Sequence, residues 1–193
     1  MHGADGAQSD AKNGPPPGGM WRLDAWESLY ANGAGATPVL ESVAGDAVPE
    51  PYQRLLVHTG DMTPTLEQFH HGGIHLEILH TQHTGDRYQR HVVLRIDGSE
   101  KPVEFGAIEI NLGAFCEASR QVILEGKRPL GAILRDFQIA HLSRPKAYFW
   151  LNSEPIINAS LQLSGSKKLY GRRNTLLLPD GRTLAEIVEI LPP

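Results

Sequence analysis

The sequence predicts an α+β domain built on a single six-stranded antiparallel sheet with flanking helices. Segments of alternating apolar and polar residues are joined by two-residue turns that are typical of antiparallel neighbours: Gly85-Asp86, Asp97-Gly98 and Asp180-Gly181. Other segments carry apolar residues at helical spacing and stop at glycine. Hydrophobic residues make up 40% of the 193 positions and charged residues 21%, so we expect a packed core.

The chain divides into three predicted parts. Residues 1–20 are rich in Gly, Pro and Ala with almost nothing to bury, which predicts a disordered tail. Residues 21–50 are expected to form a helix over 21–31, which docks on the body, and a loose linker over 32–50. The helical spacing rests on Trp21, Leu23, Trp26, Leu29 and Tyr30. Residues 51–193 form the predicted domain.

The first half of this domain begins with a strand-like apolar run, RLLVHT (54–59). Thr63-Pro64 then predicts a helix start, because proline is favoured at the first helical position, and Gly72-Gly73 predicts its end. Three strands are expected next, as an antiparallel meander over residues 74–84, 87–96 and 102–112.

The second half alternates helices and strands. A helix is predicted over 113–126, ended by Gly126, and a short helix is predicted to open at Arg128-Pro129. Residues 137–151 are mostly strand-like, but Pro145 limits them to a sheet edge or a break. A closing hairpin is expected over 169–178 and 182–191.

Composition excludes several classes of function. A net charge of −4 provides no basic field, so no nucleic-acid partner is expected. No run approaches the roughly 20 apolar residues of a membrane helix. The lone Cys116 excludes a disulfide framework and favours the cytoplasm. The histidine spacing fits no metal motif, so no metal or cofactor is expected, and a small molecule is the expected partner.

One arginine is predicted to point inward. In RYQRHVVLRI, alternation places Arg90 on the same strand face as Tyr88, Val92 and Leu94. A buried guanidinium requires an anion, because an unpaired buried charge is costly. Two interpretations follow, an internal Arg–Glu pair or a carboxylate-binding site, for which the planar fork of arginine is suited.

The last predicted strand offers possible partners for that arginine. Glu189 shares a strand face with Ile187 and Leu191, and Glu186 shares the opposite face with Leu184. Both faces are apolar, so at least one of the two glutamates is expected to be partly buried, where it pairs with arginine or has a raised pKa. Alternation does not decide between them.

Four stretches taken together resemble the chorismate pyruvate-lyase (4-hydroxybenzoate synthase) family. They occur in the family's order and extend across residues 51–193: LLVHTGDMTPTLEQF (55–69), RYQRHVVLRIDG (87–98), KRPLGAIL (127–134) and LYGRRNTLLLPDGRTLAEIVEILPP (169–193). The resemblance implies an internal ligand cavity under mobile flaps. It also implies a cofactor-free lyase that removes pyruvate from chorismate to give 4-hydroxybenzoate.

The resemblance also implies roles for single residues. Arg90 matches the arginine that holds the ring carboxylate, and Glu189 matches the catalytic glutamate near the hydroxyl end, with Glu186 as the alternative. Met62 and Thr63 match the flap turn that covers the ligand and the helix start behind it, and Leu130 matches a cavity leucine. Arg172 or Arg173 is expected to meet the enolpyruvyl carboxylate.

One departure from the family pattern favours a second interpretation. Ala107 stands where a second arginine is expected, which weakens recognition of the second carboxylate. The alternative function is a non-catalytic binding protein that uses the same cavity for an aromatic or chorismate-like acid. The same fold serves as an effector-binding module in some transcription regulators, but residues 1–50 are too rich in Gly and Pro to build their DNA-binding helices.

Overall fold

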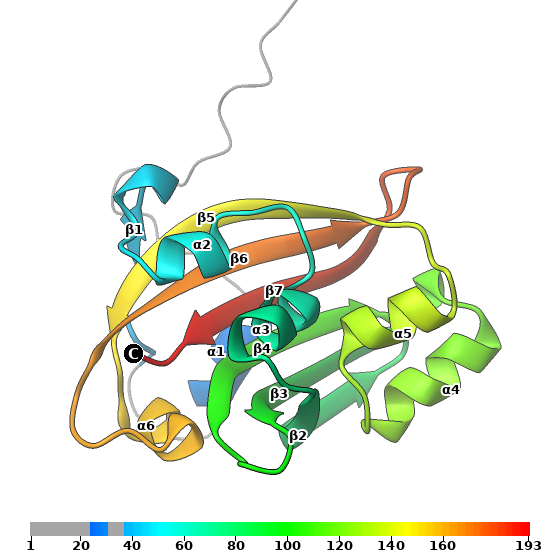
Figure 1. The fold of residues 1–193 in the computed structure, drawn as a ribbon. Coiled ribbons are helices and arrows are strands. Elements are labelled where there is room, and N and C mark those ends of the chain that lie inside the picture. The colour runs from blue at the N-terminus through cyan, green and yellow to red at the C-terminus, as the bar shows by residue number, and fades with distance from the viewer. Residues whose placement is uncertain (1–23, 31–36) are drawn as a thin grey trace, which may run out of the picture.

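The computed structural model describes residues 24–30 and 37–193. In this part of the chain seven strands form a single antiparallel sheet in the order β1-β5-β6-β7-β4-β3-β2. Figure 1 shows the sheet as a curved layer with helices on both sides. The strands are β1 (Glu41–Val43), β2 (Ile74–Thr84), β3 (Arg87–Ile96), β4 (Pro102–Asn111), β5 (Leu142–Asn152), β6 (Lys168–Leu177) and β7 (Thr183–Leu191).

The α+β class is confirmed, with seven strands in place of six. The additional strand is β1, which lies in the segment predicted as a linker and pairs with Tyr148–Trp150 of β5. Only three residues long, it carries no alternation that a sequence pattern can reveal. Pro145 was predicted to mark a sheet edge or a break. Strand β5 continues through it, but β1 pairs only with residues 148–150, and the register against β6 shifts between Pro145 and Ala147.

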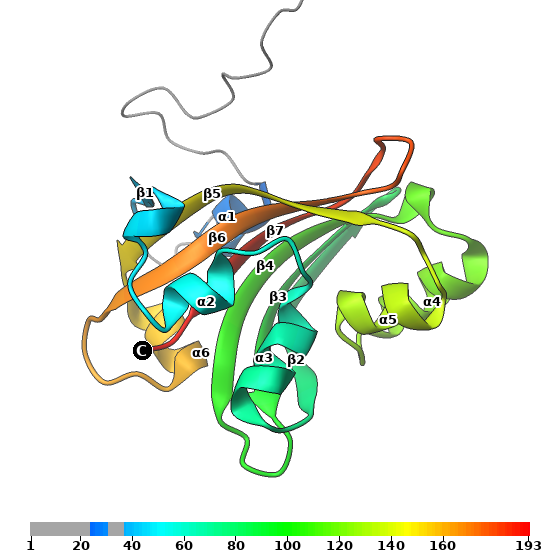
Figure 2. The ribbon, with the colours of Figure 1, turned by 45° about the horizontal axis from the view of Figure 1, so that its top comes forward.

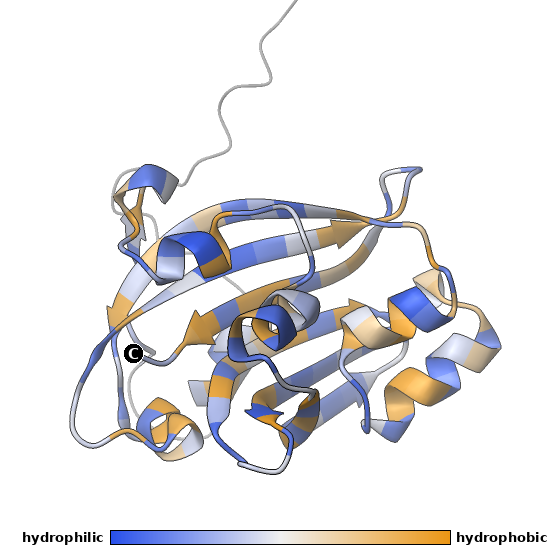
Figure 3. Ribbon diagram, in the orientation of Figure 1, coloured by the Kyte–Doolittle hydropathy of each residue, from blue (hydrophilic) through white to orange (hydrophobic). Residues whose placement is uncertain are grey.

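The predicted meander is formed by β2, β3 and β4, with antiparallel register from Ile74↔Ile96 through Arg90↔Ile108. Hydrophobic and hydrophilic residues recur in turn along these strands in Figure 3. Strand β7 then pairs with both β4 and β6, which brings the C-terminal hairpin beside the meander. The central strands β3, β4, β6 and β7 supply most of the buried positions.

The helices are short and follow most of the predicted starts and stops. Their bounds are α1 (Asp24–Tyr30), α2 (Tyr52–Leu56), α3 (Met62–His70), α4 (Glu117–Glu125), α5 (Leu130–Asp136) and α6 (Pro155–Leu161), with 3-10 turns η1 (Gly45–Ala47) and η2 (Leu112–Ala114). As predicted, α4 ends at Gly126, which has a φ of 68°, and α5 follows Pro129. Helix α3 begins one residue before the predicted Thr63.

The strand-like interpretation of residues 54–59 is wrong, because α2 takes up the first half of this run and the second half is not strand. Leu55 and Leu56 are both buried. Adjacent residues of a strand point to opposite faces, whereas adjacent residues of a helix share one side, so this pair suits a helix lying on the sheet. A short apolar run does not distinguish the two states by periodicity.

The sheet has two covered faces. Helices α2 to α5 lie over the face that carries Arg90, Gly106 and Glu189, here called the pocket face (Figures 1 and 2). Helices α1 and α6 lie over the other face, here called the α1 face, which carries Phe105 and Val188. No helix in the described ranges is long and apolar enough to cross a membrane.

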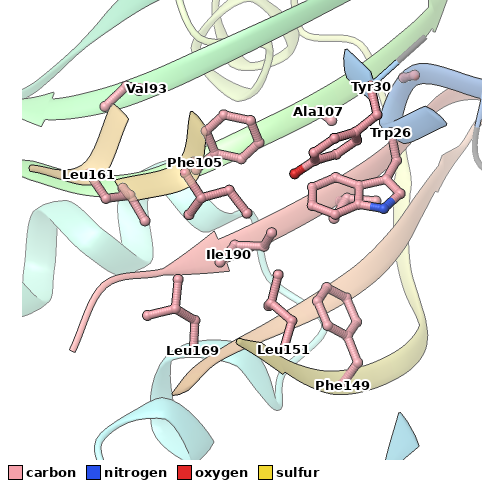
Figure 4. Packing of buried hydrophobic residues seen from close by; sticks show 13 residues of the cluster. Trp26, Tyr30, Val93, Phe105, Ala107, Phe149, Leu151, Leu161, Leu169 and Ile190 are labelled. Carbon is pink, nitrogen blue, oxygen red and sulfur yellow. The ribbon is translucent and has the colours of Figure 1, made fainter. Parts of the chain in front are cut away.

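Helix α1 packs into the core of the α1 face. Trp26 and Tyr30 lie against Phe105, and the Trp26 and Phe105 rings meet edge to face at 6.4 Å between centroids (Figure 4). Residues 1–20, Trp21 and Leu23 lie outside the described residues, as does the start of the predicted linker. The predicted domain boundaries therefore stay a prediction.

Candidate ligand-binding pocket

A pocket opens on the pocket face, between the sheet and the first turns of α3 and α5. The space between these elements, counted together with its open mouth, is about 560 Å³. The floor comes from the four central strands and β2. The two helix starts lie close to each other on the other side, where a Cβ at Gly131 would be 3.7 Å from Asp61. The lining residues are Asp61, Met62, Thr63, Leu76, Arg90, Val92, Leu94, Glu104, Gly106, Ile108, Pro129, Leu130, Gly131, Asn174, Leu176, Ile187 and Glu189.

The register of the central strands sets which side chains stand beside each other on the floor. Arg90 lies opposite Ile108, and Ile108 opposite Ile187. In the next row Val92 faces Gly106, and Gly106 faces Glu189. Because Gly106 lacks a side chain, its neighbours can lean over it: a Cβ there would lie 3.0 Å from a Val92 methyl carbon.

Arg90 is 2% exposed and carries an almost unpartnered guanidinium. Its Nη2 donates one long hydrogen bond of 3.4 Å to the Arg128 carbonyl. In the described part of the chain, Nε and Nη1 have no partner. Burial lowers the pKa of Arg90 to about 10. Of the two interpretations above, the structure therefore shows a free inward arginine and not an internal Arg–Glu pair.

The internal pair is made by Arg172 and Glu189 instead. Arg172 is 0% exposed and Glu189 4%. The Arg172 Nε donates a short hydrogen bond to Glu189 Oε2, and Nη2 donates to Oε1 at 3.4 Å. Burial alone would lower the pKa of Arg172, but the contact with Glu189 outweighs it and the pKa is raised. Both carboxylate oxygens of Glu189 are thus engaged.

Arg172 also fixes the segment that leads into α3. Its Nη1 donates to the carbonyls of Leu56 at 3.2 Å and His58 at 3.1 Å, and its Nη2 donates to the carbonyl of Gly60 at 3.3 Å. These carbonyls lie at the end of α2 and just after it, where backbone carbonyls need partners from outside the helix. One buried guanidinium therefore holds both the glutamate on the floor and the wall that begins at Asp61.

Glu104 is a second buried carboxyl group in the pocket. It is 4% exposed, and its Oε2 has no hydrogen-bond partner in the described ranges. Burial raises the pKa of Glu104 well above its ordinary value, and the neighbouring Glu189 carboxylate raises it further, against the pull of Arg172. The sequence EFGAIEI contained the information that Glu104 points into the pocket, because Glu104 lies on the same strand face as Gly106 and Ile108.

An ion pair joins the two sides of the pocket mouth. His141 Nε2 lies 3.0 Å from Asp61 Oδ1, which connects the segment before β5 with the start of α3. Burial would lower the pKa of His141, but the Ile139 carbonyl and the Asp61 carboxylate raise it overall. The Asp61 carboxylate is therefore compensated and leaves the positive charge of Arg90 unopposed.

The structure brings together five of the residues singled out in the sequence. Arg90, Met62, Thr63, Leu130 and Glu189 all line the pocket. Their roles in binding stay proposals.

The structure also decides three other sequence-based expectations. Arg172 lies behind Glu189 and does not line the pocket, while Arg173 points to the α1 face and lies 3.4 Å from Glu186. Glu186 is therefore turned away from the pocket. Ala107 is buried in the α1 face core with Phe105 and Trp26. A larger side chain at position 107 would enter that core, so Ala107 is not a vacant carboxylate site.

Gly171 allows Arg172 to sit between its neighbouring strands. A Cβ at Gly171 would collide with the carbonyl oxygen of Glu189 and would lie 2.6 Å from a carbon of the Phe149 ring. We expect Gly171→Ala to lower the free energy of unfolding by about 1–3 kcal/mol, because overpacking a well-filled core forces the backbone to shift. Urea denaturation measures this effect.

Gly131→Ala provides the matched control. A Cβ at Gly131 has its nearest neighbour at 3.7 Å, which is ordinary contact, and the residue lies inside α5. Alanine is favoured over glycine in a helix by up to about 1 kcal/mol, so this variant should be equally or more stable. Equal stability of the two variants would contradict the close strand approach at Gly171.

Comparison with solved structures identifies the fold. The structure of PhnF from Mycobacterium smegmatis matches with a TM-score of 0.54 at 12% identity, over 70% of this chain and 65% of that one. The chain shares the fold of PhnF. The separate effector domain of PhnF matches with a TM-score of 0.53 at 12% identity, over 68% of this chain and 88% of that one.

A further match has a name that states its role. The ligand-binding domain described as that of a GntR-family transcriptional regulator from Bordetella bronchiseptica matches with a TM-score of 0.48 at 12% identity, over 62% of this chain and 85% of that one. No protein-family model and no curated protein matches the sequence. The two PhnF structures confirm the fold that the resemblance implied, whereas none of these matches is named as a chorismate lyase.

The prediction that the chain is a lyase is wrong. The structures that share its fold with a TM-score above 0.5 are PhnF and its effector domain, and neither is named as a lyase. The geometry supplies a physical reason: the glutamate expected to serve as base is held by Arg172 at both oxygens. The Arg172 guanidinium already donates hydrogen bonds to Glu189 and to backbone carbonyls, so it is not free to bind a second substrate carboxylate.

Three other predictions can be compared with these structures. Lyase, chorismate and pyruvate chemistry finds no support in them. The expected absence of a nucleic-acid partner is not tested by them and stays a prediction. The cytoplasmic location likewise stays a prediction.

Proposed function

We propose that the chain is a non-catalytic binding protein for a small aromatic carboxylic acid, with Arg90 holding the carboxylate. The observation that carries this proposal is the unpartnered Arg90 guanidinium inside a pocket. A buried charge without a partner is costly, and a bound carboxylate removes that cost. Two parallel N–H groups on guanidinium match the two oxygens of a carboxylate.

The rest of the pocket supports an apolar, ring-shaped ligand. Aliphatic side chains surround Arg90 on the floor and on the α5 wall: Leu76, Val92, Leu94, Ile108, Leu130, Leu176 and Ile187. Between them Gly106 has no side chain, and Val92 and Glu104 close over it, to within 3.0 and 3.3 Å of the point that a Cβ would occupy. Few polar groups in a mostly apolar cavity are typical of sites that orient a small organic ligand.

Charge balance favours a single carboxylate. The Asp61 carboxylate is paired with His141, and Arg172 is paired with Glu189, so Arg90 is the cation of the lining without a carboxylate partner in the described residues. A ligand with two carboxylates would place the second beside Glu104 and Glu189. The shared fold with an effector domain supports binding without turnover.

A calorimetric titration with benzoate and with benzamide tests the proposal. The two molecules have nearly the same shape, but only benzoate carries a charge. We expect benzoate to bind at least about tenfold more tightly, because charge-assisted hydrogen bonds are roughly twice as strong as neutral ones. Equal affinity for the two molecules, or no binding of either, would contradict the proposal.

Two variants locate the effect. Arg90→Gln should remove the preference for benzoate. Arg87→Gln is the control: Arg87 lies on the same strand, points to the α1 face and pairs with Glu109 at 2.6 Å. It should keep the preference. Loss of the preference in both variants would mean that general charge, rather than Arg90, attracts the anion.

A further inference from the structure

Two histidines hold the wall of the pocket, and their contacts require opposite protonation states. His58 lies in the segment between α2 and α3, and His141 lies just before β5. Both side chains are partly buried. The groups that contact the two rings are backbone amides and carbonyls, a guanidinium and a carboxylate, each of which can act only as donor or only as acceptor. The contacts therefore define which ring nitrogens carry a proton.

The contacts of His58 require the neutral imidazole. Its Nδ1 accepts from two groups that can only donate, the Gly60 backbone N–H at 3.1 Å and the Arg172 Nη1 at 3.4 Å. Its Nε2 lies 2.7 Å from the Leu55 carbonyl, which can only accept. Nδ1 must therefore carry the lone pair and Nε2 the proton. A second proton would face two donors and the charge of Arg172, so falling pH disrupts this arrangement.

The contacts of His141 require the charged imidazolium. Its Nδ1 lies 3.0 Å from the Ile139 carbonyl, and its Nε2 lies 3.0 and 3.2 Å from the two oxygens of the Asp61 carboxylate. Both partners can only accept, so both ring nitrogens must donate, and only the imidazolium does this. Loss of one proton leaves one of the two contacts without a hydrogen. Rising pH therefore disrupts this arrangement.

The pKa values of the two rings are shifted in the directions that these contacts require. Burial and the nearby Arg172 charge lower the pKa of His58. Burial alone would lower the pKa of His141, but the Ile139 carbonyl and the Asp61 carboxylate raise it overall. The ordinary pKa of histidine, about 6.5, lies between the two. Around this pH both arrangements exist together.

The two histidines act on the same stretch of chain, residues 58–61, here called the latch segment. His58, its first residue, accepts from a backbone amide within the segment. Asp61, its last residue, lines the pocket and is bound by His141 across the mouth. Arg172 donates to two carbonyls of the segment, and contact with Glu189 raises its pKa, so this anchor stays charged while histidines titrate. The segment thus has one permanent anchor and two that depend on pH.

We propose that His58 and His141 form a two-sided pH latch, which holds this wall of the pocket in place while His58 is neutral and His141 is charged. Acid releases the wall at His58, and base releases it at Asp61. The wall is therefore tightest in a band of pH and loosens on both sides of it. This inference goes beyond the proposed function, because the latch controls access to the pocket whatever molecule binds there.

Other titratable groups near the two rings can add to a pH profile. In the described part of the chain, Asp61 is the charged group in contact with His141. The titratable groups that face His58 or its neighbour Arg172 are Glu104 of β4, Tyr148 of β5 and Glu189 of β7. Substitution of each histidine separates its transition from those of these groups.

Nuclear magnetic resonance of the histidine ring nitrogens tests the proton positions directly in the unmodified protein. At a pH of about 6.5, where an ordinary histidine is half protonated, we expect His58 to be the neutral Nε2–H tautomer and His141 to be the imidazolium. A neutral His141 or a charged His58 at this pH would overturn the latch. The measurement requires no substitution and no ligand.

The methyl resonance of Met62 follows the wall itself. Met62 is 5% exposed and lies in the pocket lining directly after the latch segment. In a pH series from about 5 to about 9 we expect two transitions of this resonance. Protection of the Gly60 amide against hydrogen exchange should fall about three- to tenfold on each side, as expected for one lost hydrogen bond. A resonance and a protection factor that stay constant throughout would contradict the latch.

Two variants assign the transitions. His58→Asn keeps a side-chain acceptor near the position of Nδ1 but does not titrate, so it should lose the acid transition and keep the alkaline one. His141→Lys stays charged to a pH of about 10, so its alkaline transition should move beyond the series. His75→Gln is the control and should keep both transitions, because His75 contacts Asp97 at 2.8 Å and Glu100 at 3.2 Å at the β3–β4 turn.

Each outcome decides one half of the latch. An acid transition that persists in His58→Asn belongs to one of the neighbouring carboxyl groups and removes His58 from the latch. An alkaline transition that does not move in His141→Lys removes His141. Neither result affects the proposed carboxylate site at Arg90, because no ligand is used. Absence of benzoate binding would in turn overturn the proposed function and leave the latch standing.

Discussion

Replacing Arg172 with methionine is expected to lower the free energy of unfolding by about 3–5 kcal/mol. The substitution leaves the Glu189 carboxylate buried without its partner, which is costlier than removing a whole ion pair. It also strips the carbonyls of Leu56, His58 and Gly60 of a donor. The α2–α3 segment should loosen together with the pocket wall. Urea denaturation followed by circular dichroism measures the loss.

Two further variants test whether the loss of stability comes from breaking the Arg172–Glu189 pair and not from removing one positive charge. Arg173→Met changes the neighbouring residue, whose side chain is 22% exposed and faces the other side of the sheet, and should cost far less. Arg172→Met combined with Glu189→Leu should recover part of the stability, because no uncompensated carboxylate remains. A single Arg172→Met variant as stable as Arg173→Met would contradict the described pairing.

Replacing Arg90 with methionine is expected to have the opposite effect on stability. Without ligand the variant should be more stable by about 1–3 kcal/mol, which is the cost of a buried group whose hydrogen bonds are unmade. Burial has already lowered the pKa of this arginine to about 10, which reflects the same cost. Sequence reasoning ties a stability loss at this position to a glutamate partner, and the structure shows no such partner in the described residues.

The same variant should no longer respond to ligand. In the unmodified protein a saturating aromatic acid stabilises the folded state by mass action, about 2.7 kcal/mol at a hundred times the dissociation constant. In Arg90→Met this increment should be close to zero. Arg87→Met, on the same strand, should keep it. An Arg90→Met variant that is less stable than the unmodified protein and still stabilised by benzoate would contradict the role of Arg90.

Strand alternation predicted the part of the pocket that lies on regular strands. The meander and the inward direction of Arg90 follow directly from residue parity, and the register shift after Pro145 follows from the missing amide hydrogen. The same rule applied to EFGAIEI predicts that Glu104 points into the pocket. The arginine expected at position 107 would instead point to the α1 face, where Ala107 is buried. Parity decides direction reliably wherever a strand has no bulge.

The sequence alone could not show which of the inward-pointing charged residues pair with each other. Two inward arginines and two inward glutamates allow several pairings, and only the strand order decides among them. Because β7 lies between β4 and β6, Glu189 stands directly opposite Arg172 on one side and Gly106 on the other. Arg90 lies two strands away from β7 and stays free. The same long-range order attaches β1 to β5, which three residues of local sequence cannot reveal.

The most direct test of the account is a nuclear magnetic resonance titration of the arginine Nε–H groups with benzoate. The Arg90 resonance is assigned by its disappearance in Arg90→Gln, and that of Arg172 by its disappearance in Arg172→Met. We predict that the Arg90 resonance shifts with saturation while the Arg172 resonance, already bonded to Glu189, stays in place. A titration in which Arg90 is unmoved at saturating benzoate would contradict the central claim that this arginine holds the carboxylate.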